Sequence, residues 1–452
     1  MPELDIVIRG GQVVTAREVL RTDIGIAGGW IVTFGDDLPA PRHETIDATG
    51  LHIFPGVIDP HVHFNEPGRT EWEGMETGSR AFVAGGGAVF FDMPLNSSPP
   101  LLNVDAFNAK RRLSAKSLAD FALWGGLTPK NLDQIRSLAI RGVIGFKAFM
   151  CDSGLDEFPA SDDNTLRQGM VIAAQHKLPV AVHAESEAMT RQLTGERIEH
   201  GLTSARDWLD SRPVEAELDA IRRALALAEE TKCKLHVVHV SGGEGVALIA
   251  AAQARGVDVS CETCPHYLAL TEDDLFTLGA PAKCAPPLRP QAAQDLLWAS
   301  MLAGQIAFVA SDHSPAPPEM KTGEDYFKIW GGIAGVQHTL PLLLTEGHHR
   351  RGLDLPSVAR LTSHNAAVRF GLRPEKGGIK IGAEADLAFV NLHAEFEVHR
   401  WELLNRHALS PYAGRKLRGQ VVRTMIFGQT LFLDGKIVAT RGGNLLKPAG
   451  KL

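Results

Sequence analysis

The sequence has 452 residues, of which 44% are hydrophobic and 22% are charged, and its formal net charge is −7. With a mean hydropathy of −0.04, these values indicate a soluble globular protein and exclude a membrane-embedded one, because no apolar run approaches the ~20 residues of a membrane span. The acidic balance and the lack of a long basic run argue against a nucleic-acid partner, so we expect a small-molecule substrate.

The first residues and the cysteines predict the compartment. Residues 1–5 have neither the basic region nor the apolar region of a signal peptide, which favours a cytoplasmic protein. The cysteines form a sparse, odd-numbered set, as expected of free thiols in a reducing compartment. They are Cys151, Cys233, Cys261, Cys264 and Cys284.

The N-terminal segment reads as short strands. Residues 4–14 and 21–26 are apolar runs separated by glycine turns, a pattern typical of β-hairpins. We therefore expect a small β-structure before the main domain.

The central segment, residues 53–371, alternates short apolar runs with helical patterns, which predicts repeated βα units around a parallel sheet. In residues 214–232, for example, Leu218, Ile221 and Leu225 recur at helical spacing. Strands that are buried on both faces read as continuous apolar runs. Eight such runs occur, at residues 53–58, 88–93, 119–124, 142–149, 178–183, 235–240, 257–261 and 306–310. The fold class predicted is therefore α/β, with a TIM-like (β/α)8 barrel.

The C-terminal segment resembles the N-terminal one in pattern. Its strand and hairpin patterns lie at residues 379–382, 385–390, 421–427 and 431–436. These strands could pair with the N-terminal ones. We expect a composite β-sandwich of residues 1–52 and 372–452, so that both termini hold the catalytic barrel of residues 53–371.

The first predicted barrel strand is followed by His61 and His63. Residues i and i+2 of a strand lie on the same face, so both imidazoles would point at one spot, as metal ligands do. A single His-x-His pair is a weak signal, because such pairs also occur on solvated strands. The pair becomes informative only together with the residues at the ends of the other strands.

Catalytic residues of such barrels gather where the strands meet their following loops. At these positions the chain carries Lys147, His183, His239 and Asp312. Taken alone, either histidine could be a hydrogen-bonded core residue, and Asp312 could cap a helix. Together with His61 and His63 they predict a metal site at one mouth of the barrel.

Lys147 lies between apolar residues in a central strand. Burying its ammonium costs several kcal/mol unless it is neutralised or paired. Carbamylation fits this position, because a desolvated lysine of lowered pKa reacts with carbon dioxide, and the carbamate has two oxygens that can bridge two metal ions. We therefore predict an N6-carboxylysine at position 147.

Two divalent ions ~3.5 to 4 Å apart would lower the pKa of a bridging water from about 15.7 towards 7. Such a site suits hydrolysis of an amide, with Asp312 as metal ligand and as the group that transfers a proton to the leaving nitrogen. Histidine, carboxylate and carbamate ligands accept zinc, manganese, cobalt or iron. We expect zinc.

The arrangement resembles the metal-dependent amidohydrolase superfamily, and within it the cyclic-amidohydrolase branch of hydantoinases, dihydropyrimidinases, dihydroorotases and allantoinases. The resemblance covers nearly the whole chain and includes the run at residues 377–387, typical of the returning sandwich strands. It implies two metal ions bound by His61, His63, His183, His239, carbamylated Lys147 and Asp312, the last also acting as the catalytic base. It also implies a homotetramer.

Within this branch the chain is most similar to the allantoinases. The segments that carry the likeness are residues 64–74, 92–97, 283–289, 311–315 and 330–335. Dihydroorotases place an arginine two residues after the second histidine to bind a carboxylate, and Asn65 stands there. Hydantoinases place a tyrosine five residues after the lysine to support the oxyanion, and Asp152 stands there.

The resemblance implies hydrolysis of the hydantoin ring of allantoin to allantoate, a step of purine and ureide breakdown. The first alternative is a hydantoinase or dihydropyrimidinase acting on another cyclic amide. The second is a non-catalytic assembly protein, although such relatives lose metal ligands. Candidate substrate contacts are Asn65, Asn96, Ser153, Cys284, Ala285 and Gly332. His266 and His313 near the mouth could contact substrate or support other residues.

Overall fold

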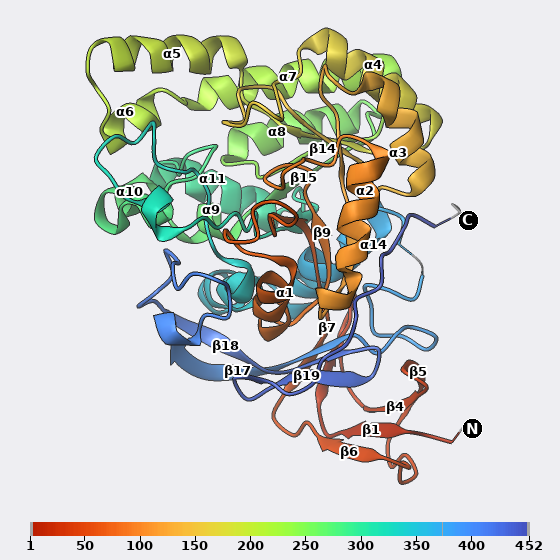
Figure 1. The fold of residues 1–452 in the computed structure, drawn as a ribbon. Coiled ribbons are helices and arrows are strands. Elements are labelled where there is room, and N and C mark those ends of the chain that lie inside the picture. The colour runs from red at the N-terminus through yellow and green to blue at the C-terminus, as the bar shows by residue number, and fades with distance from the viewer. Residues whose placement is uncertain (1–2, 373, 450–452) are drawn as a thin grey trace.

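The computed structural model describes residues 3–372 and 374–449. Within these residues, parallel strands form a barrel, helices cover it, and two smaller sheets lie at one end (Figure 1). This confirms the α/β class, the TIM-like barrel and the sandwich made from both ends of the chain. Among the helices of the described ranges, none has the length and apolar character that a membrane span requires.

The barrel strands follow one another in chain order. They are β8 (Val57–Val62), β9 (Gly87–Asp92), β10 (Asp120–Leu123), β11 (Gly125–Gly126), β12 (Phe146–Phe149), β13 (Val180–His183), β14 (Leu235–Val237), β15 (Val259–Thr263) and β16 (Phe308–Val309). β8 to β10 pair in parallel, as do β11 to β16. β10 and β11 are separated only by Trp124, and a bridge between Val62 and His313 joins the last strand region to the first. The ring is therefore closed.

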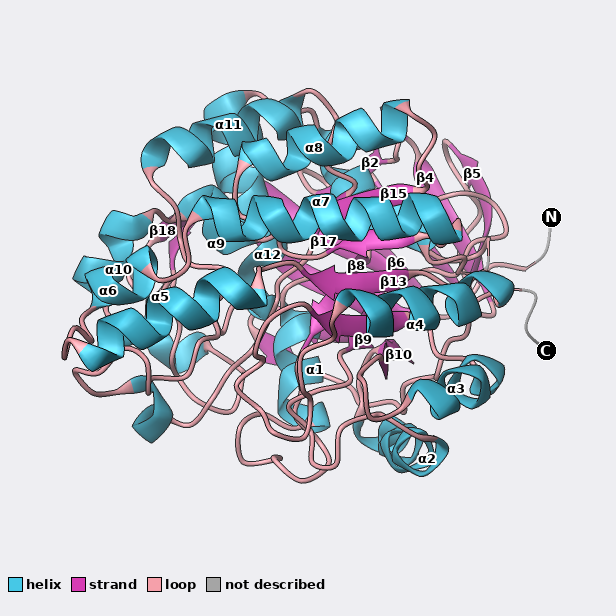
Figure 2. Ribbon diagram, turned by 90° about the horizontal axis from the view of Figure 1, so that it is seen from above, coloured by secondary structure: helices cyan, strands magenta, loops and turns pink. Residues whose placement is uncertain are grey.

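Helices form the outer layer, and seen from above α4, α7 and α8 lie in front of the strands (Figure 2). α7 packs on β14 and α8 packs on β15, and all residues of these two strands are buried. The helices are α1 (Met75–Ala84), α2 (Val104–Arg111), α3 (Ile135–Arg141), α4 (Asp163–Gln175), α5 (Glu187–Glu199), α6 (Ala205–Asp210), α7 (Val214–Thr231), α8 (Gly243–Ala254), α9 (Pro265–Ala269), α10 (Glu272–Leu278), α11 (Gln291–Leu302), α12 (Thr339–Leu343), α13 (Leu355–Ala359) and α14 (Asn365–Arg369).

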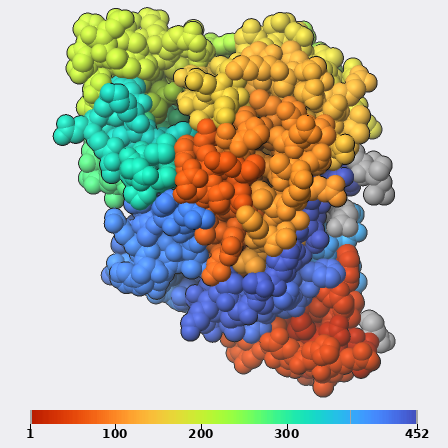
Figure 3. Space-filling model, viewed as in Figure 1, coloured from red at the N-terminus to blue at the C-terminus, as the bar shows by residue number. Residues whose placement is uncertain are grey.

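The two ends of the chain build the sandwich, and Figure 3 shows the red N-terminal and blue C-terminal segments together at the bottom. The four-stranded sheet has the order β5 (Trp30–Gly35), β4 (Asp23–Ala27), β1 (Ile6–Arg9) and β6 (Glu44–Asp47). The seven-stranded sheet has the order β20 (Lys436–Ile437), β19 (Gln429–Leu433), β18 (Lys416–Ile426), β17 (Leu387–Glu397), β7 (His52–Pro55), β2 (Gln12–Val14) and β3 (Val19–Arg21). Ile24, Ile26, Ile53, Leu387 and Met425 share the core of this domain.

The expected strand at residues 53–58 is wrong in one respect, because the run is divided at Gly56 between two sheets. β7 pairs with β17 in the sandwich, and β8 begins the barrel. A Cβ atom at Gly56 would lie 2.5 Å from the Cβ of Ala88, so only glycine fits at this crossing. The division of the chain into residues 1–52 with 372–452 and residues 53–371 stays a prediction, and β7 crosses the first of these bounds.

A buried ionic network ties the barrel to the C-terminal segment. The Lys376 ammonium lies 2.7 Å from carboxylate oxygens of both Asp120, on β10, and Asp386. Asp120 also accepts hydrogen bonds from Arg441 and from the backbone N–H of Asn444. Removing one partner of such a network leaves a buried charge unpaired, which is costly, so the two domains are fixed against each other.

Candidate metal centre

The predicted ligands of the metal site meet at the carboxyl end of the barrel. His61 lies near the end of β8, His183 ends β13, and His63, His239 and Asp312 lie in the residues that follow β8, β14 and β16. All five line one cavity of about 380 Å³. The convergence follows from the fold, since parallel strands of a barrel all end at the same face.

The imidazoles and the carboxylate are close enough to share metal ions. Asp312 Oδ1 lies 3.1 Å from His61 Nε2 and 3.4 Å from His63 Nε2. The ring centroids of His183 and His239 are 4.6 Å apart, and those of His61 and His239 are 5.5 Å apart. One potential ligand atom from each of His61, His63 and Asp312 falls within 4.8 Å of the others, a spacing that one ion could bridge.

Lys147 is fully buried in β12, and its Nζ has no hydrogen-bond partner within residues 3–372 and 374–449. The ammonium nitrogen lies 5.1 Å from the centroid of the Phe149 ring. Burial lowers the pKa of Lys147 to about 8, against the opposing attraction of Asp312 and Glu262. A modified lysine would explain why this buried amine, close to the candidate ligands, has no hydrogen-bond partner.

Burial keeps most of the site histidines neutral. It lowers the pKa of His61 and His239 well below the usual range, and it lowers the pKa of His183 against the opposing effect of Glu185. A neutral imidazole has a free lone pair for a metal, so these side chains are in the protonation state that binding requires.

Buried carboxylates hold two of the histidines in place. Glu262, on β15, lies 2.5 Å from His61 Nδ1, and its other oxygen lies 3.0 Å from His236 Nε2. Glu185 lies 2.6 Å from His183 Nε2, and the same oxygen accepts a hydrogen bond from Arg212. Such contacts fix the tautomer and the ring orientation of metal-binding histidines.

The two carboxylates differ in their electrostatics. Burial raises the pKa of Glu262 well above its usual range, and Lys147 only partly offsets this. For Glu185, burial also favours the neutral acid, but Arg212 and the hydrogen bond from His183 outweigh it and lower the pKa to about 2. Glu185 is therefore an anion at neutral pH, and Glu262 depends on positive charge close to it.

Two of the candidate ligands have a left-handed backbone. The φ angle is 39° at His239 and 44° at Asp312, and it is also positive at Asn65 (64°) and Asn96 (70°). Residues other than glycine rarely adopt this region, and such backbone strain is concentrated at functional sites. The left-handed backbone at these four residues changes the direction in which their side chains leave the chain.

The candidate substrate contacts divide into two groups. Asn96, Ser153, Ala285 and Gly332 line the cavity, whereas Asn65 and Cys284 are not part of its wall. The side chain of Asn65 is fully buried and donates a hydrogen bond to the carbonyl of Pro315. Asn65 therefore holds a loop together.

His313 and His266, for which the sequence allowed either substrate contact or a supporting role, have different surroundings. His313 Nε2 lies 3.3 Å from Glu73, and its Nδ1 accepts a hydrogen bond from the N–H of Gly335, so it supports the loops of the mouth. His266 is fully buried, and neither ring nitrogen has a partner in the described ranges. Potential ligand atoms of His266, Cys264 and Asp312 lie within 4.8 Å of one another.

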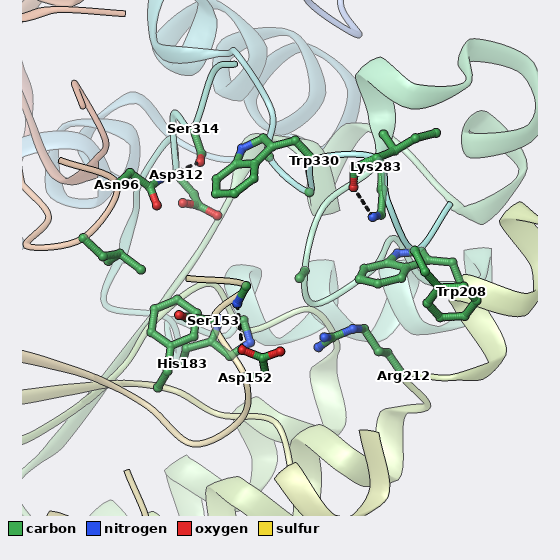
Figure 4. Close-up of a pocket in the computed structure, with 18 of the residues that line it drawn as sticks. Asn96, Asp152, Ser153, His183, Trp208, Arg212, Lys283, Asp312, Ser314 and Trp330 are labelled. Atoms are coloured by element: carbon green, nitrogen blue, oxygen red, sulfur yellow. Dashed lines mark hydrogen bonds between the residues drawn. The ribbon is translucent and has the colours of Figure 1, made fainter. Parts of the chain in front are cut away.

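Several residues of the site were not found by sequence reasoning. Figure 4 shows Lys283, Trp208 and Arg212 on one side of the pocket and His183, Asp312 and Asn96 on the other. The only sequence signal for Glu185 is its position two residues after His183, directly behind the strand that His183 ends. Lys283 lies two residues before Ala285, in a segment that we noted for another reason.

Comparison with known proteins agrees with this geometry. Residues 52–438 match the model of the amidohydrolase family. The chain is 55% identical to an allantoinase of Solibacter usitatus, covering 98% of this chain and 97% of that protein. It is 52% identical to an allantoinase of Deinococcus radiodurans, covering 98% and 99%.

Solved structures show the same architecture. The L-hydantoinase (dihydropyrimidinase) from Arthrobacter aurescens superposes with a TM-score of 0.95 at 32% identity, covering 98% of this chain and all (100%) of that one. The dihydropyrimidinase from Brevibacillus agri NCHU1002 superposes with a TM-score of 0.91 at 30% identity, covering 97% of both chains.

Proposed function

The chain belongs to the amidohydrolase family, and we propose that within it the chain hydrolyses the hydantoin ring of allantoin to give allantoate, a step of purine and ureide breakdown. The observation that carries this proposal is the high identity, over nearly full length, to proteins named allantoinase. The enzyme is a cyclic amidohydrolase, and divalent metal ions are a general property of its family.

We propose two metal ions per chain, held by His61, His63, His183, His239, Lys147 and Asp312. The neutral state of the buried imidazoles and the unpaired Nζ of Lys147 support this set. Carbon dioxide would add to the neutral amine of Lys147 and release a proton, which turns an unpaired buried nitrogen into an anionic ligand. Zinc is the first candidate, and manganese, cobalt or iron would also suit these ligands.

When bound, the ions would polarise the ring amide carbonyl and activate a water for attack. We infer that Asp312, whose Oδ1 lies 3.1 Å from His61 Nε2, accepts a proton and delivers it to the leaving ring nitrogen. Glu262 and Glu185 keep the imidazoles of His61 and His183 in fixed orientations. Phe149, whose ring stacks on His183, and Trp330 also line the cavity.

The hydantoinase or dihydropyrimidinase alternative has one observation in its favour, the close superposition on solved hydantoinases. That likeness comes at much lower sequence identity than the likeness to allantoinases. A non-catalytic assembly protein fits less well, because the six predicted ligands are all present and five of them line one cavity.

The state of the enzyme in the cell is part of the proposal. We propose a cytoplasmic homotetramer that acts on a small molecule. All five cysteines are buried and free, which supports a reducing compartment. Sedimentation analysis of the purified protein would test the tetramer.

The decisive experiment compares kcat/KM for allantoin, hydantoin, dihydrouracil and dihydroorotate, together with metal analysis of the purified protein. We expect allantoin to exceed each of the others by at least ~10², because a site built for a polar substituent loses binding when its polar groups are left unpaired. Equal turnover of dihydrouracil would move the assignment to the hydantoinase alternative. A protein without activity or bound metal would favour the assembly protein.

A further inference from the structure

A buried lysine forms the end of the cavity opposite the metal centre. Lys283 has only 2% of its surface exposed, yet it lines the same cavity as the predicted metal ligands. Its ammonium nitrogen lies 3.8 Å from the centroid of the Trp208 ring and donates a hydrogen bond to the carbonyl of Ile329 (Figure 4). An ammonium has three N–H groups, and the carbonyl of Ile329 accepts a hydrogen bond from one of them.

Lys283 differs from the other cations of this cavity, because among the described residues no carboxylate forms an ion pair with it. Arg212 is paired with Glu185 at 2.6 Å, and Lys328 is paired with Asp325 at 3.0 Å. A buried cation without a counter-ion needs hydrogen-bond acceptors to offset the cost of leaving water. The carbonyl of Ile329 supplies one acceptor, and the cavity is the place from which a bound molecule could supply another.

The neighbouring side chains also carry unused donors. The indole N–H groups of Trp208 and Trp330 and the Nε–H of Arg212 are buried without a partner within the described residues, and all three side chains line the cavity. Lys283 and Arg212 supply N–H donors to this end of the cavity. The chemical complement is a group with a hydrogen-bond acceptor.

We propose that Lys283 binds the carbonyl oxygen of the ureido group on the substrate ring and thereby sets the preference for allantoin over cyclic amides with apolar substituents. This inference rests on the proposed function. With the ring amide at the metal centre, the substituent extends towards the end that Lys283 forms. A neutral carbonyl fits better than a carboxylate, because Asp152 lines the same cavity and would repel a second anion.

Lys321 offers a matched control for a purely structural role of Lys283. It is also a buried lysine, and it donates hydrogen bonds to the carbonyls of Lys283, Trp330 and Gly332 at 3.3, 2.9 and 2.7 Å. Both lysines thus hold the loop at residues 329–332. Of these two lysines, Lys283 lines the cavity of the metal centre and Lys321 does not.

The experiment measures kcat and KM of wild type, Lys283→Met and Lys321→Met with allantoin, hydantoin and 5-isobutylhydantoin. We expect Lys283→Met to lower the ratio of kcat/KM for allantoin to that for hydantoin by about 10- to 100-fold, mostly through KM, as for loss of a hydrogen bond to a charged group. Measured at a pH below the pKa of Lys283, where that side chain is charged in both proteins, Lys321→Met should change kcat/KM for both substrates by the same factor. In Lys283→Met, kcat/KM for 5-isobutylhydantoin should rise relative to kcat/KM for allantoin.

Equal losses for allantoin and hydantoin in Lys283→Met would overturn the inference, because they would show that Lys283 only holds the loop. If Lys283→Met does not fold, Lys283→Gln keeps a shorter donor, and its selectivity ratio is then the deciding value. Failure of the proposed function gives a different result. In that case wild type itself shows no preference for allantoin, whatever the variants do.

Discussion

The two ends of the cavity are built in different ways. At the metal end the side chains come from the ends of barrel strands or the residues directly after them, and buried carboxylates such as Glu262 fix their orientation. At the other end, Trp208 comes from α6, whereas Lys283 and Trp330 lie in loops. Strands position catalytic groups rigidly, and loops vary without disturbing them. We therefore propose that reaction and substrate choice are carried by separate parts of the molecule.

The two ends also differ in the groups that they leave unpaired. The metal end has the amine of Lys147, which fits a modification and a metal. Among the described residues, the opposite end has buried N–H groups without a partner on Trp208, Trp330 and Arg212. Changes at the metal end should therefore affect every substrate, and changes at the opposite end should affect one substrate against another.

The largest effect is expected from Lys147→Ala at the metal end. The variant should lose much of its bound metal and nearly all activity with every substrate, because the proposed carbamate ligand would be missing. Lys147→Arg should fail as well, since a guanidinium stays charged and cannot be carbamylated. Metal content and turnover are the measurements, and Lys321→Met serves as the buried-lysine control that keeps its metal. An unmodified amine in a metal-replete crystal structure would refute the carbamate.

A second large effect is expected from Asp312→Asn. The amide cannot accept the proton, so kcat should fall by ~10² to 10⁴, the range for loss of a general acid or base. The loss should be equal for allantoin and hydantoin, because the change lies at the metal end. Rates must be compared at matched metal occupancy, and a variant as active as wild type would exclude Asp312 as the proton carrier.

A smaller effect is expected from Glu262→Gln, which weakens the support of His61. Metal affinity should fall by about 10- to 100-fold, as is typical when a group behind a ligand is changed. Titration with a chelator would measure it. Glu73→Gln is the matched control, because Glu73 contacts His313, which lies outside the predicted ligand set. Similar losses in both variants would mean that the effect is one of general stability.

The smallest effect concerns pH and the opposite end of the cavity. Burial, together with the positive charges of Lys321 and Arg212, lowers the pKa of Lys283 to about 7 against the weaker attraction of Asp325. The side chain is then charged below this pH and neutral above it, so its hydrogen bond to a carbonyl weakens as pH rises.

The ratio of kcat/KM for allantoin to that for hydantoin should therefore fall by roughly 3- to 10-fold between about pH 6 and about pH 9, the difference between charged and neutral hydrogen bonds. Effects of pH on the metal centre act on both substrates and cancel in this ratio. The ratio in Lys283→Met should stay flat. A ratio that falls equally in wild type and in this variant would assign the titration to another group.

Much of the metal end could be predicted from sequence, and the reason is geometric. His61, His63, His183, His239 and Asp312 were found because they follow buried apolar runs, and parallel strands that close into a barrel must end at one face. Lys147 was found because a charged side chain inside such a run requires an explanation. Their joint role as ligands stays a prediction.

The sequence did not reveal which side chains outside the strands turn into the cavity. The contact between Asn65 and substrate stays a prediction, and its amide donates a hydrogen bond to the carbonyl of Pro315 outside the cavity wall. Lys283 was not expected to contact substrate, yet it lines the cavity beside Trp208. Residues far apart in the chain decide both cases, so spacing along the sequence carries no signal for them.

The sequence by itself thus determined the type of fold and the residues that follow its strands, because alternation and apolar runs reflect local geometry. Only the tertiary structure decided that Gly56 divides one apolar run between two sheets, that Glu262 lies behind His61, and that Lys283 faces the metal centre across the cavity. These features depend on contacts between distant segments, which form only when the barrel closes and its loops pack over the mouth.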